Sequence, residues 1–356
     1  MSTKPTIQSI QMLRALAASL VVIAHAQVHL EVRGHIQDLD PFLDLGRVGV
    51  DLFFVISGFI MVYVAGNEFT KPGAPRDFFI RRIIRVVPTY WIYTSALAVL
   101  MILLPHLFSE GKGFGFQHYL ASLFFIPWEN NIGHLKPLLP VGWTLNYEMY
   151  FYLVFAILLF MPRRYFLAGL SICLGGGIIA GILYRPLPSL LSVATSPLLS
   201  EFLVGCGIGI LFTGTARLSR TIAHALIATG IIWLLLAAGG VIPHTIRAVS
   251  WGLPSAMIVA GILFLEKSSS IPISKLLVAI GGSSYSLYLT HIFTINALGK
   301  IWVSLFNGHY GLFIVACVIG SVIVGHLAYL VIEKPVIRFL GDRYRSYKAN
   351  RMPATA

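Results

Sequence analysis

Charged residues are scarce in this chain of 356 residues: they make up only 11% of it, whereas hydrophobic residues make up 57%. The mean hydropathy is correspondingly high, at +0.81. Soluble globular domains carry roughly 25% charged residues, so this composition excludes an ordinary soluble domain. It predicts an all-α, polytopic membrane protein, a bundle of transmembrane helices.

Cysteine is also rare, with three residues at positions Cys173, Cys206 and Cys317. All three lie in apolar segments, without the spacing of metal ligands and without the pattern of a disulfide framework. The histidines are spread over separate segments and also lack ligand spacing. We therefore expect no metal cofactor, and we expect the cysteines to be small core residues.

Acidic residues are fewer than basic ones, 14 Asp and Glu against 26 Lys and Arg, and the formal net charge is +12. Such an excess can indicate a nucleic-acid partner, but here the basic residues lie in short segments between apolar runs. With the N-terminus in the cytoplasm, inner segments hold 18 Lys and Arg and outer segments hold seven. The positive-inside rule then predicts that both termini are cytoplasmic, and no nucleic acid is expected.

Ten apolar runs are long enough to span a bilayer. They lie at about 10–30, 48–65, 83–104, 144–161, 165–184, 197–213, 221–241, 248–265, 284–306 and 311–333. A shorter run at 118–127 is predicted to be a re-entrant or interfacial helix. No internal repeat or appended soluble domain is visible in the sequence. We expect one transmembrane domain over residues 1–340 and a basic cytoplasmic tail over 341–356.

The first apolar run contains two ionisable residues, Arg14 and His25, eleven residues apart. At 3.6 residues per turn they lie on nearly the same helix face, about 16 Å apart along the axis. Ionisable side chains inside a membrane normally face the protein interior or a wet cavity. The spacing therefore predicts a polar path through much of the bilayer. The alternative is that both residues snorkel from the two ends of the span.

Arg82 and Arg85 are three residues apart and share one helix face at the cytoplasmic mouth of the third span. Guanidinium groups form bidentate pairs with phosphate oxygens. The pair would suit a cytoplasmic substrate with several phosphates, such as an acyl-CoA or a nucleotide. The alternative is that these residues only set the membrane topology.

Glu148 lies about one turn into the fourth span, with Tyr152 one turn further along the same face. A buried carboxylate needs a partner or it becomes protonated. We predict His25 as that partner, because a carboxylate that orients a histidine is a common general-base arrangement. The alternative is a glutamate that hydrogen-bonds to helix ends.

Five further polar or small residues allow more than one role. Ser57 and Gly58 are expected to permit close packing of helices. Glu201 opens the outer end of the sixth span and contacts either an acceptor or nothing. His291 is either a second catalytic residue or a partner for tyrosine. Glu333 is expected to mark only the end of the last span.

Together, and in this order, these segments resemble the acyltransferase 3 family of integral membrane acyltransferases. The resemblance covers residues 8–338 and rests on the Arg14–His25 pair and on the stretches GVDLFFVISGF, RRIIRVVPTYW, GWTLNYEMYFYLVF, SYSLYLTH and EKP. It implies transfer of an acyl group, commonly acetyl, from cytoplasmic acyl-CoA to a sugar hydroxyl across the bacterial cytoplasmic membrane. It also implies that the family relies on the positions of Arg14, His25, Arg82, Arg85 and Glu148.

The sequence therefore predicts an acyl-CoA-dependent O-acyltransferase with acetyl-CoA as co-substrate. Some family members carry a fused SGNH-type domain; we expect this chain to act without one, on an exopolysaccharide, O-antigen or lipid-linked saccharide. Polysaccharide-synthesis proteins and membrane lipids are the expected partners. The predicted catalytic residues are His25 and Glu148, the donor-binding residues are Arg14, Arg82 and Arg85, and the substrate-binding residues are Tyr152, Glu201 and His291.

Two other classes of protein fit parts of the same pattern. A saccharide or small-anion transporter could use Arg14 and His25 as a relay. However, the sequence shows no pair of Gly- or Pro-interrupted half-repeats of the kind that marks a transporter site. A scaffold for polysaccharide synthesis would need neither residue for chemistry. Dependence on acyl-CoA separates the enzyme from both.

Overall fold

The computed structural model describes residues 5–33, 41–108, 114–130, 133–184, 189–243, 245–268, 271–305 and 309–351. Within these ranges the chain is helical and contains no strand, apart from an isolated bridge between Glu129 and Leu135. The helices are α1 (Gln8–Arg33), α2 (Val48–Ala65), α3 (Ala74–Leu103), α4 (Phe116–Leu123), α5 (Trp143–Leu158), α6 (Arg163–Leu170), α7 (Gly176–Leu183), α8 (Leu199–Thr213), α9 (Arg220–Ala238), α10 (Leu253–Lys267), α11 (Lys275–Gly282), α12 (Ser284–Leu305), α13 (Tyr310–Ala328) and α14 (Lys334–Arg351).

Seven short turns connect or interrupt these helices. Four are 3-10 turns: η1 (Pro41–Arg47), η2 (Pro105–Leu107), η3 (Pro140–Gly142) and η5 (Ser189–Leu191). Three are π-helical turns: η4 (Ser171–Gly175) and η7 (Tyr329–Glu333) interrupt longer helices, and η6 (Ala248–Gly252) begins the segment that continues as α10. Single π-turns of this kind often occur at functional sites.

The predicted all-α, polytopic membrane bundle is confirmed. Among the described residues, seven helical segments are long and apolar enough to cross a membrane. They are Gln8–Val32, Leu43–Ala65, Ala74–Leu103, Arg163–Leu183, Arg220–Ala238, Ala248–Lys267 and Tyr310–Asn350. An eighth is possible if α11 and α12 form one span, bent by 74°.

The two other predicted spans correspond to shorter helices. Helix α5 has 16 residues and α8 has 15, so they are about 24 and 22 Å long at 1.5 Å per residue. The hydrocarbon core of a bilayer is roughly 30 Å thick. The number of ten spans and the cytoplasmic position of both termini therefore stay predictions. The run predicted as re-entrant or interfacial forms the eight-residue helix α4.

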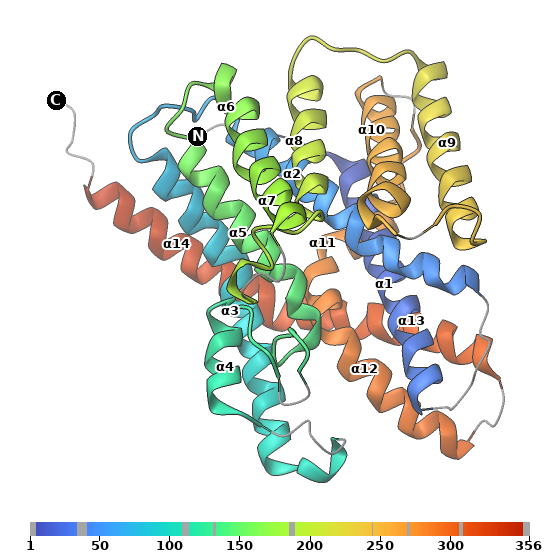
Figure 1. The fold of residues 1–356 in the computed structure, drawn as a ribbon. Coiled ribbons are helices and arrows are strands. Elements are labelled where there is room, and N and C mark those ends of the chain that lie inside the picture. Colours follow the sequence, from blue (N-terminus) through green and yellow to red (C-terminus); the bar gives the residue numbers. More distant parts are fainter. Residues whose placement is uncertain are drawn as a thin grey trace.

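Helix α1 packs against α2, α11, α12 and α13 (Figure 1). Its side chains at these contacts are mostly small and apolar, for example Ala17, Ala18 and Ala26, all fully buried. The first backbone N–H groups of a helix have no partner within it. In α1, those of Gln8 and Ser9 donate to the carboxylate of Glu266 on α10, each at 2.9 Å.

Helices α2 and α8 approach so closely that glycine is required at their contact. A Cβ atom on Gly58 would overlap the backbone oxygen of Phe202, and one on Gly205 would overlap that of Val55. Small residues permit such close contact in membranes, where packing rather than the hydrophobic effect drives helix association. The prediction that Gly58 is a packing residue is confirmed.

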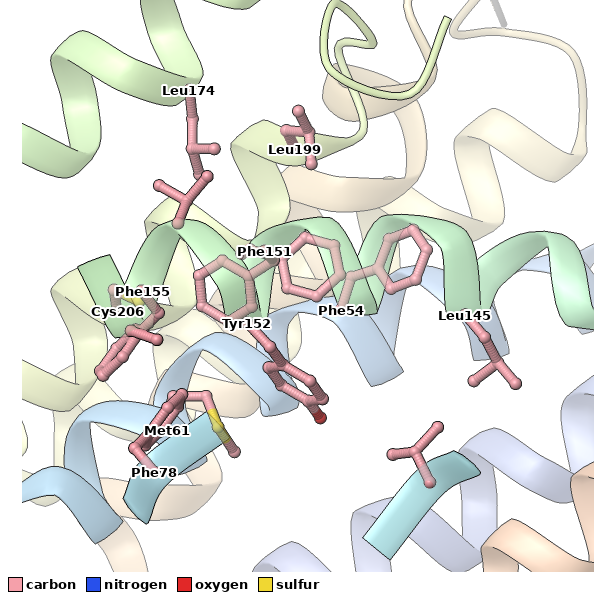
Figure 2. Packing of buried hydrophobic residues seen from close by; sticks show 14 of the residues in the cluster. Phe54, Met61, Phe78, Leu145, Phe151, Tyr152, Phe155, Leu174, Leu199 and Cys206 are labelled. Carbon is pink, nitrogen blue, oxygen red and sulfur yellow. The ribbon is translucent and has the colours of Figure 1, made fainter. Parts of the chain in front are cut away.

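An aromatic cluster fixes the rotation of α5 (Figure 2). The ring of Phe151 lies 4.7 Å from that of Phe202, which stacks on Phe54 at 4.5 Å. One turn further along α5, Phe155 stacks on Phe78 at 4.8 Å. Tyr152 points away from the Phe54 and Phe151 rings, with its hydroxyl group at the far end. The aromatic packing therefore decides which face of α5 is left for polar contacts.

Two predictions about the surface need comment. Cys206 and Cys317 are buried as expected, but Cys173 is exposed on the turn η4, so its assignment to the core was wrong. The basic tail continues helix α14 as far as Arg351. It lies against α3 (Figure 1), where Lys348 and the hydroxyl of Tyr344 both bond to Asp77.

Substitution of Gly205 by alanine should destabilise the protein, because the new methyl group would push α2 and α8 apart. We expect a loss of about 2 kcal/mol, as for other overpacked interiors. The matched control is Gly207→Ala on the same helix, where a Cβ would meet nothing within 4 Å. Thermal unfolding in detergent measures both variants. Equal midpoints for the two would contradict the close contact.

Candidate active site

A cavity of about 140 Å³ lies between α1, α2, α3, α5 and α12. This is about ten times the volume that a single water molecule needs. Its lining includes five of the eight predicted site residues: Arg14, Arg82, Arg85, Glu148 and Tyr152. Segments that are far apart in the sequence thus bring three arginines and one glutamate into a single cavity, which we call the arginine cavity.

Two of the three arginines have no hydrogen-bonded counter-ion in the described part of the chain. Among the described residues Arg14 forms no hydrogen bond or ion pair, although the charges of Arg85, Glu333 and Glu148 act on it. The guanidinium of Arg82 lies 5.8 Å from the ring of Phe78, and its buried Nε atom has no partner. Burial of an unpaired charge is costly. The cavity is therefore electrostatically suited to an anion.

The third arginine is paired. Arg85 Nη1 donates to the carboxylate of Glu333, and its guanidinium lies 5.8 Å from the ring of Tyr285. The Arg85 side chain is 30% exposed, whereas that of Glu333 is completely buried. Glu333 is thus more than the end of a span, and that expectation was wrong, because the π-helical turn η7 brings its carboxylate into the bundle next to α3.

Glu148 obtains its hydrogen bonds inside the arginine cavity. Ser57 Oγ donates to Glu148 Oε1 at 2.9 Å, and the hydroxyl of Tyr152 donates to the same oxygen. The expectation that Ser57 is only a packing residue was wrong. Consecutive residues on a helix point about 100° apart, so Gly58 meets α8 while Ser57 faces Glu148.

His25 lies outside the residues that line the cavity. Its Nδ1 atom bonds to the carbonyl oxygen of Val21, 2.9 Å away and one turn earlier in α1. A carbonyl oxygen only accepts, so in the neutral ring Nδ1 carries the proton and Nε2 carries the lone pair. The predicted contact between His25 and Glu148 is not formed, because Ser57 and Tyr152 hold the Glu148 carboxylate in the cavity.

His291 connects the cavity to His25. Its ring is fully buried and lies edge-on to that of His25, with 4.8 Å between centroids. The ring of Tyr288, one turn earlier on α12, lies 5.8 Å from that of His291, and Tyr288 lines the arginine cavity. The Tyr288 hydroxyl donates to the Val141 carbonyl at 2.9 Å, which fixes the ring. In the described ranges, no three His, Cys, Asp or Glu side chains are grouped as metal ligands.

Comparison with known proteins decides the family. A family model described as an acyltransferase domain, that of the acyltransferase 3 family, matches residues 7–326. The chain belongs to the acyltransferase 3 family. The resemblance seen in the sequence is thereby confirmed, and the chain is an integral, multi-pass membrane protein of a family that transfers acyl groups.

Two relatives with curated names match most of the chain. The exopolysaccharide production protein ExoZ of Rhizobium meliloti (strain 1021) is 33% identical over 297 residues, which cover 83% of this chain and 90% of ExoZ. Nodulation protein 10 of Rhizobium leguminosarum bv. viciae is 26% identical over 352 residues and 92% of each chain. No solved structure matches the chain significantly.

The remaining predicted site residue of this acyltransferase, Glu201, lies outside the arginine cavity. It is 2% exposed, and neither carboxylate oxygen receives an N–H or O–H from a described residue. Its neighbour is the fully buried Asp51, which forms two hydrogen bonds with Arg247, at 2.8 and 3.1 Å. An acceptor-binding role for Glu201 stays a prediction.

Sequence reasoning missed Ser57, Tyr285, Tyr288 and Glu333 as residues around the acyltransferase cavity. All four lie within stretches that carried the family resemblance, but each also fits a role in packing or span termination. The only local signal was the acidic residue at the end of the last predicted span, Glu333. The positive-inside rule explains basic residues at a span end but not an acidic one. An acidic residue there therefore suggests a specific partner for its carboxylate.

Removal of Arg247 should destabilise the acyltransferase, because it leaves the buried carboxylate of Asp51 without its counter-ion. We expect Arg247→Ala to cost about 3 kcal/mol, typical of a broken buried pair. Arg47→Ala is the control, because Arg47 pairs with Asp44 at the surface and such pairs contribute at most about 1 kcal/mol. Thermal unfolding in detergent should show a larger loss of stability for Arg247→Ala than for Arg47→Ala. A larger loss for Arg47→Ala would refute the prediction.

Proposed function

We propose that this protein is an acyl-CoA-dependent O-acyltransferase. It moves an acyl group, most simply acetyl, from cytoplasmic acyl-CoA to a hydroxyl of an extracytoplasmic or lipid-linked saccharide. The observation that carries the proposal is the arginine cavity, where two of three guanidinium groups have no hydrogen-bonded counter-ion among the described residues. Such a cavity suits a donor that carries several negative charges.

Arg82 and Arg85 bind the phosphates of CoA, since guanidinium groups pair with phosphate oxygens in a bidentate manner. Arg14 lines the path of the pantetheine arm. Pockets that enclose a whole drug-sized ligand measure roughly 300 Å³ or more. The cavity of about 140 Å³ therefore encloses only one part of the donor, and the remainder extends from it.

Glu148 acts in the site as a negative charge that partly balances those of the arginines. Its carboxylate accepts hydrogen bonds from Ser57 and Tyr152, and its charge acts on Arg14 and Arg82. These contacts hold it at the donor end of the site rather than beside His25. Tyr152 supports this position through its hydroxyl group.

His25 carries the chemistry through Nε2, the ring nitrogen with the lone pair. In one route it takes the proton of the acceptor hydroxyl as that oxygen attacks the thioester carbonyl. The C–S bond breaks, and the proton passes to the CoA thiolate. In the other route Nε2 attacks the thioester and holds the acyl group, which the acceptor oxygen then removes. The hydroxyl proton again ends on CoA.

The acceptor is proposed to be a saccharide. ExoZ is named for exopolysaccharide production, and it matches most of this chain. The chain would then act at the bacterial cytoplasmic membrane together with polysaccharide-synthesis proteins. His291, which contacts His25, and Glu201 remain the proposed residues on the acceptor side.

Substitution of His25 by alanine should abolish turnover and leave binding of acyl-CoA intact, because the ring serves the chemical step. Purified protein in detergent with radiolabelled acetyl-CoA reports CoA release and label transfer to a panel of lipid-linked saccharides. His224→Ala is the matched control, since His224 makes the same bond to a carbonyl one turn earlier, 2.8 Å, on the exposed side of α9. Near-full transfer by His25→Ala would refute the assignment. A transporter would show no CoA release in any variant.

Substitution of Arg82 or Arg85 by alanine should weaken acyl-CoA binding. Each loses a charge-assisted contact, so the dissociation constant should rise about tenfold to a hundredfold. Arg81→Ala is the control, because Arg81 lies next to Arg82 on α3 but does not line the cavity. Equilibrium binding of labelled acetyl-CoA measures the three variants. An unchanged affinity for Arg82→Ala and Arg85→Ala would sink their donor-binding role.

A further inference from the structure

The buried carboxylate of Glu333 joins two elements that the proposed reaction uses. One oxygen accepts from Arg85 of the arginine cavity. The other accepts from Ser286 on α12, from the backbone N–H at 3.0 Å and from the hydroxyl at 2.6 Å. The side chain is 0% exposed, so these three donors supply its stabilisation in place of water.

The contact with Ser286 replaces a missing cap at the start of α12. Ser286 is the third residue of this helix, where the backbone N–H has no partner within the helix. The residue before the helix, Ser283, would ordinarily accept that hydrogen bond. Its hydroxyl instead donates to the Ile280 carbonyl at 3.0 Å, because α11 and α12 meet at Ser283 with a bend of 74°. Glu333 therefore caps α12 from a distant helix.

Helix α12 carries the residues that lie between the arginines and His25. Tyr285 and Tyr288 line the cavity, and His291 contacts the ring of His25. Tyr285 is also held by a hydrogen bond from its hydroxyl to the Val86 carbonyl, at 2.8 Å. Any rotation or shift of α12 would therefore move the cavity wall and also change the contact of His291 with His25.

We infer that Glu333 is a positioning residue for acyl transfer: it orients Arg85 toward the donor phosphates and fixes α12 so that His291 stays against His25. The inference rests on the proposed function, because it assigns a donor to the arginine cavity. A carboxylate suits both tasks, since it pairs with a guanidinium and its negative charge is stabilised near the N-terminus of a helix, the positive end of the helix dipole. Glutamine would keep the size of the side chain and lose the charge.

The chain offers a matched control. Glu266 caps α1 from α10 through two backbone N–H groups, as Glu333 caps α12, but it contacts no arginine of the cavity. If Glu333 has only a structural role, Glu333→Gln and Glu266→Gln should both lower the unfolding midpoint and leave the kinetic constants unchanged. If Glu333 is a positioning residue, Glu333→Gln should also change the kinetic constants, whereas Glu266→Gln should not.

The experiment measures KM for acetyl-CoA and kcat for the full-length protein in detergent, in wild type, Glu333→Gln, Arg85→Ala, the double variant and Ser286→Ala. We expect KM to rise about tenfold in Glu333→Gln, comparable with the loss of one charged hydrogen bond. It should rise no further when Glu333→Gln is added to Arg85→Ala, because the two residues act as one unit. Ser286→Ala should lower kcat severalfold and raise KM less than Glu333→Gln does, since it loosens α12 but leaves the ion pair of Glu333 with Arg85 in place.

Three outcomes would overturn the inference. In the first, the wild type is active and Arg85→Ala raises KM, but the kinetic constants of Glu333→Gln stay within twofold of wild type. This result removes the role of Glu333 and leaves the proposed function standing. Additive KM effects of Arg85→Ala and Glu333→Gln would separate the two residues. A wild type without acyl-CoA binding or turnover refutes the proposed function and this inference with it.

A second substitution serves if Glu333→Gln does not fold. Glu333→Asp keeps the charge but is one methylene shorter, so its carboxylate cannot reach Arg85 and Ser286 together. A positioning role predicts a raised KM in Glu333→Asp that disappears in the Arg85→Ala background. A KM equal to that of wild type would overturn the inference.

Discussion

Three guanidinium groups, those of Arg14, Arg82 and Arg85, face one cavity inside a bundle of apolar helices. Arginine stays protonated in proteins, so the bundle must supply negative charge or bind it. Glu148 faces the same cavity, and Glu333 pairs with Arg85. Nevertheless Arg14 and Arg82 have no hydrogen-bonded counter-ion in the described chain. The helices α1, α3, α5 and α12 thus enclose a cavity whose positive charge is only partly balanced by the described residues.

Helix ends inside the bundle meet a second constraint, because every backbone polar group must be satisfied where water is scarce. The break between α11 and α12 leaves the start of α12 among other helices. Glu333 accepts a hydrogen bond from one backbone N–H there, that of Ser286, and Glu266 accepts from two at the start of α1. In both cases the carboxylate comes from a helix far away in the sequence, so that the cap also ties two helices together.

The arginine cavity and the histidine pair are separate parts of the candidate site. Glu148 is held among the arginines by Ser57 and Tyr152, whereas His25 is oriented by the Val21 carbonyl of its own helix. A carboxylate is therefore not needed to fix the tautomer of His25. Tyr288 and His291 lie between the two parts, so α12 forms the wall that connects the arginine cavity with His25.

The sequence by itself determined what depends on local periodicity: the apolar helices, the shared face of Arg14 and His25, and the pairing of Arg82 with Arg85 on one turn. A helix period of 3.6 residues is the same wherever the helix packs. Only the tertiary structure decided which side chains meet across helices. Ser57 meets Glu148 over 91 residues and Arg85 meets Glu333 over 248, while the expected pair of His25 and Glu148 does not form. Such pairings depend on the rotation of each helix about its axis. Close contacts set this rotation, for example that of Gly58 with α8 and the aromatic cluster on α5. No local sequence pattern encodes these contacts.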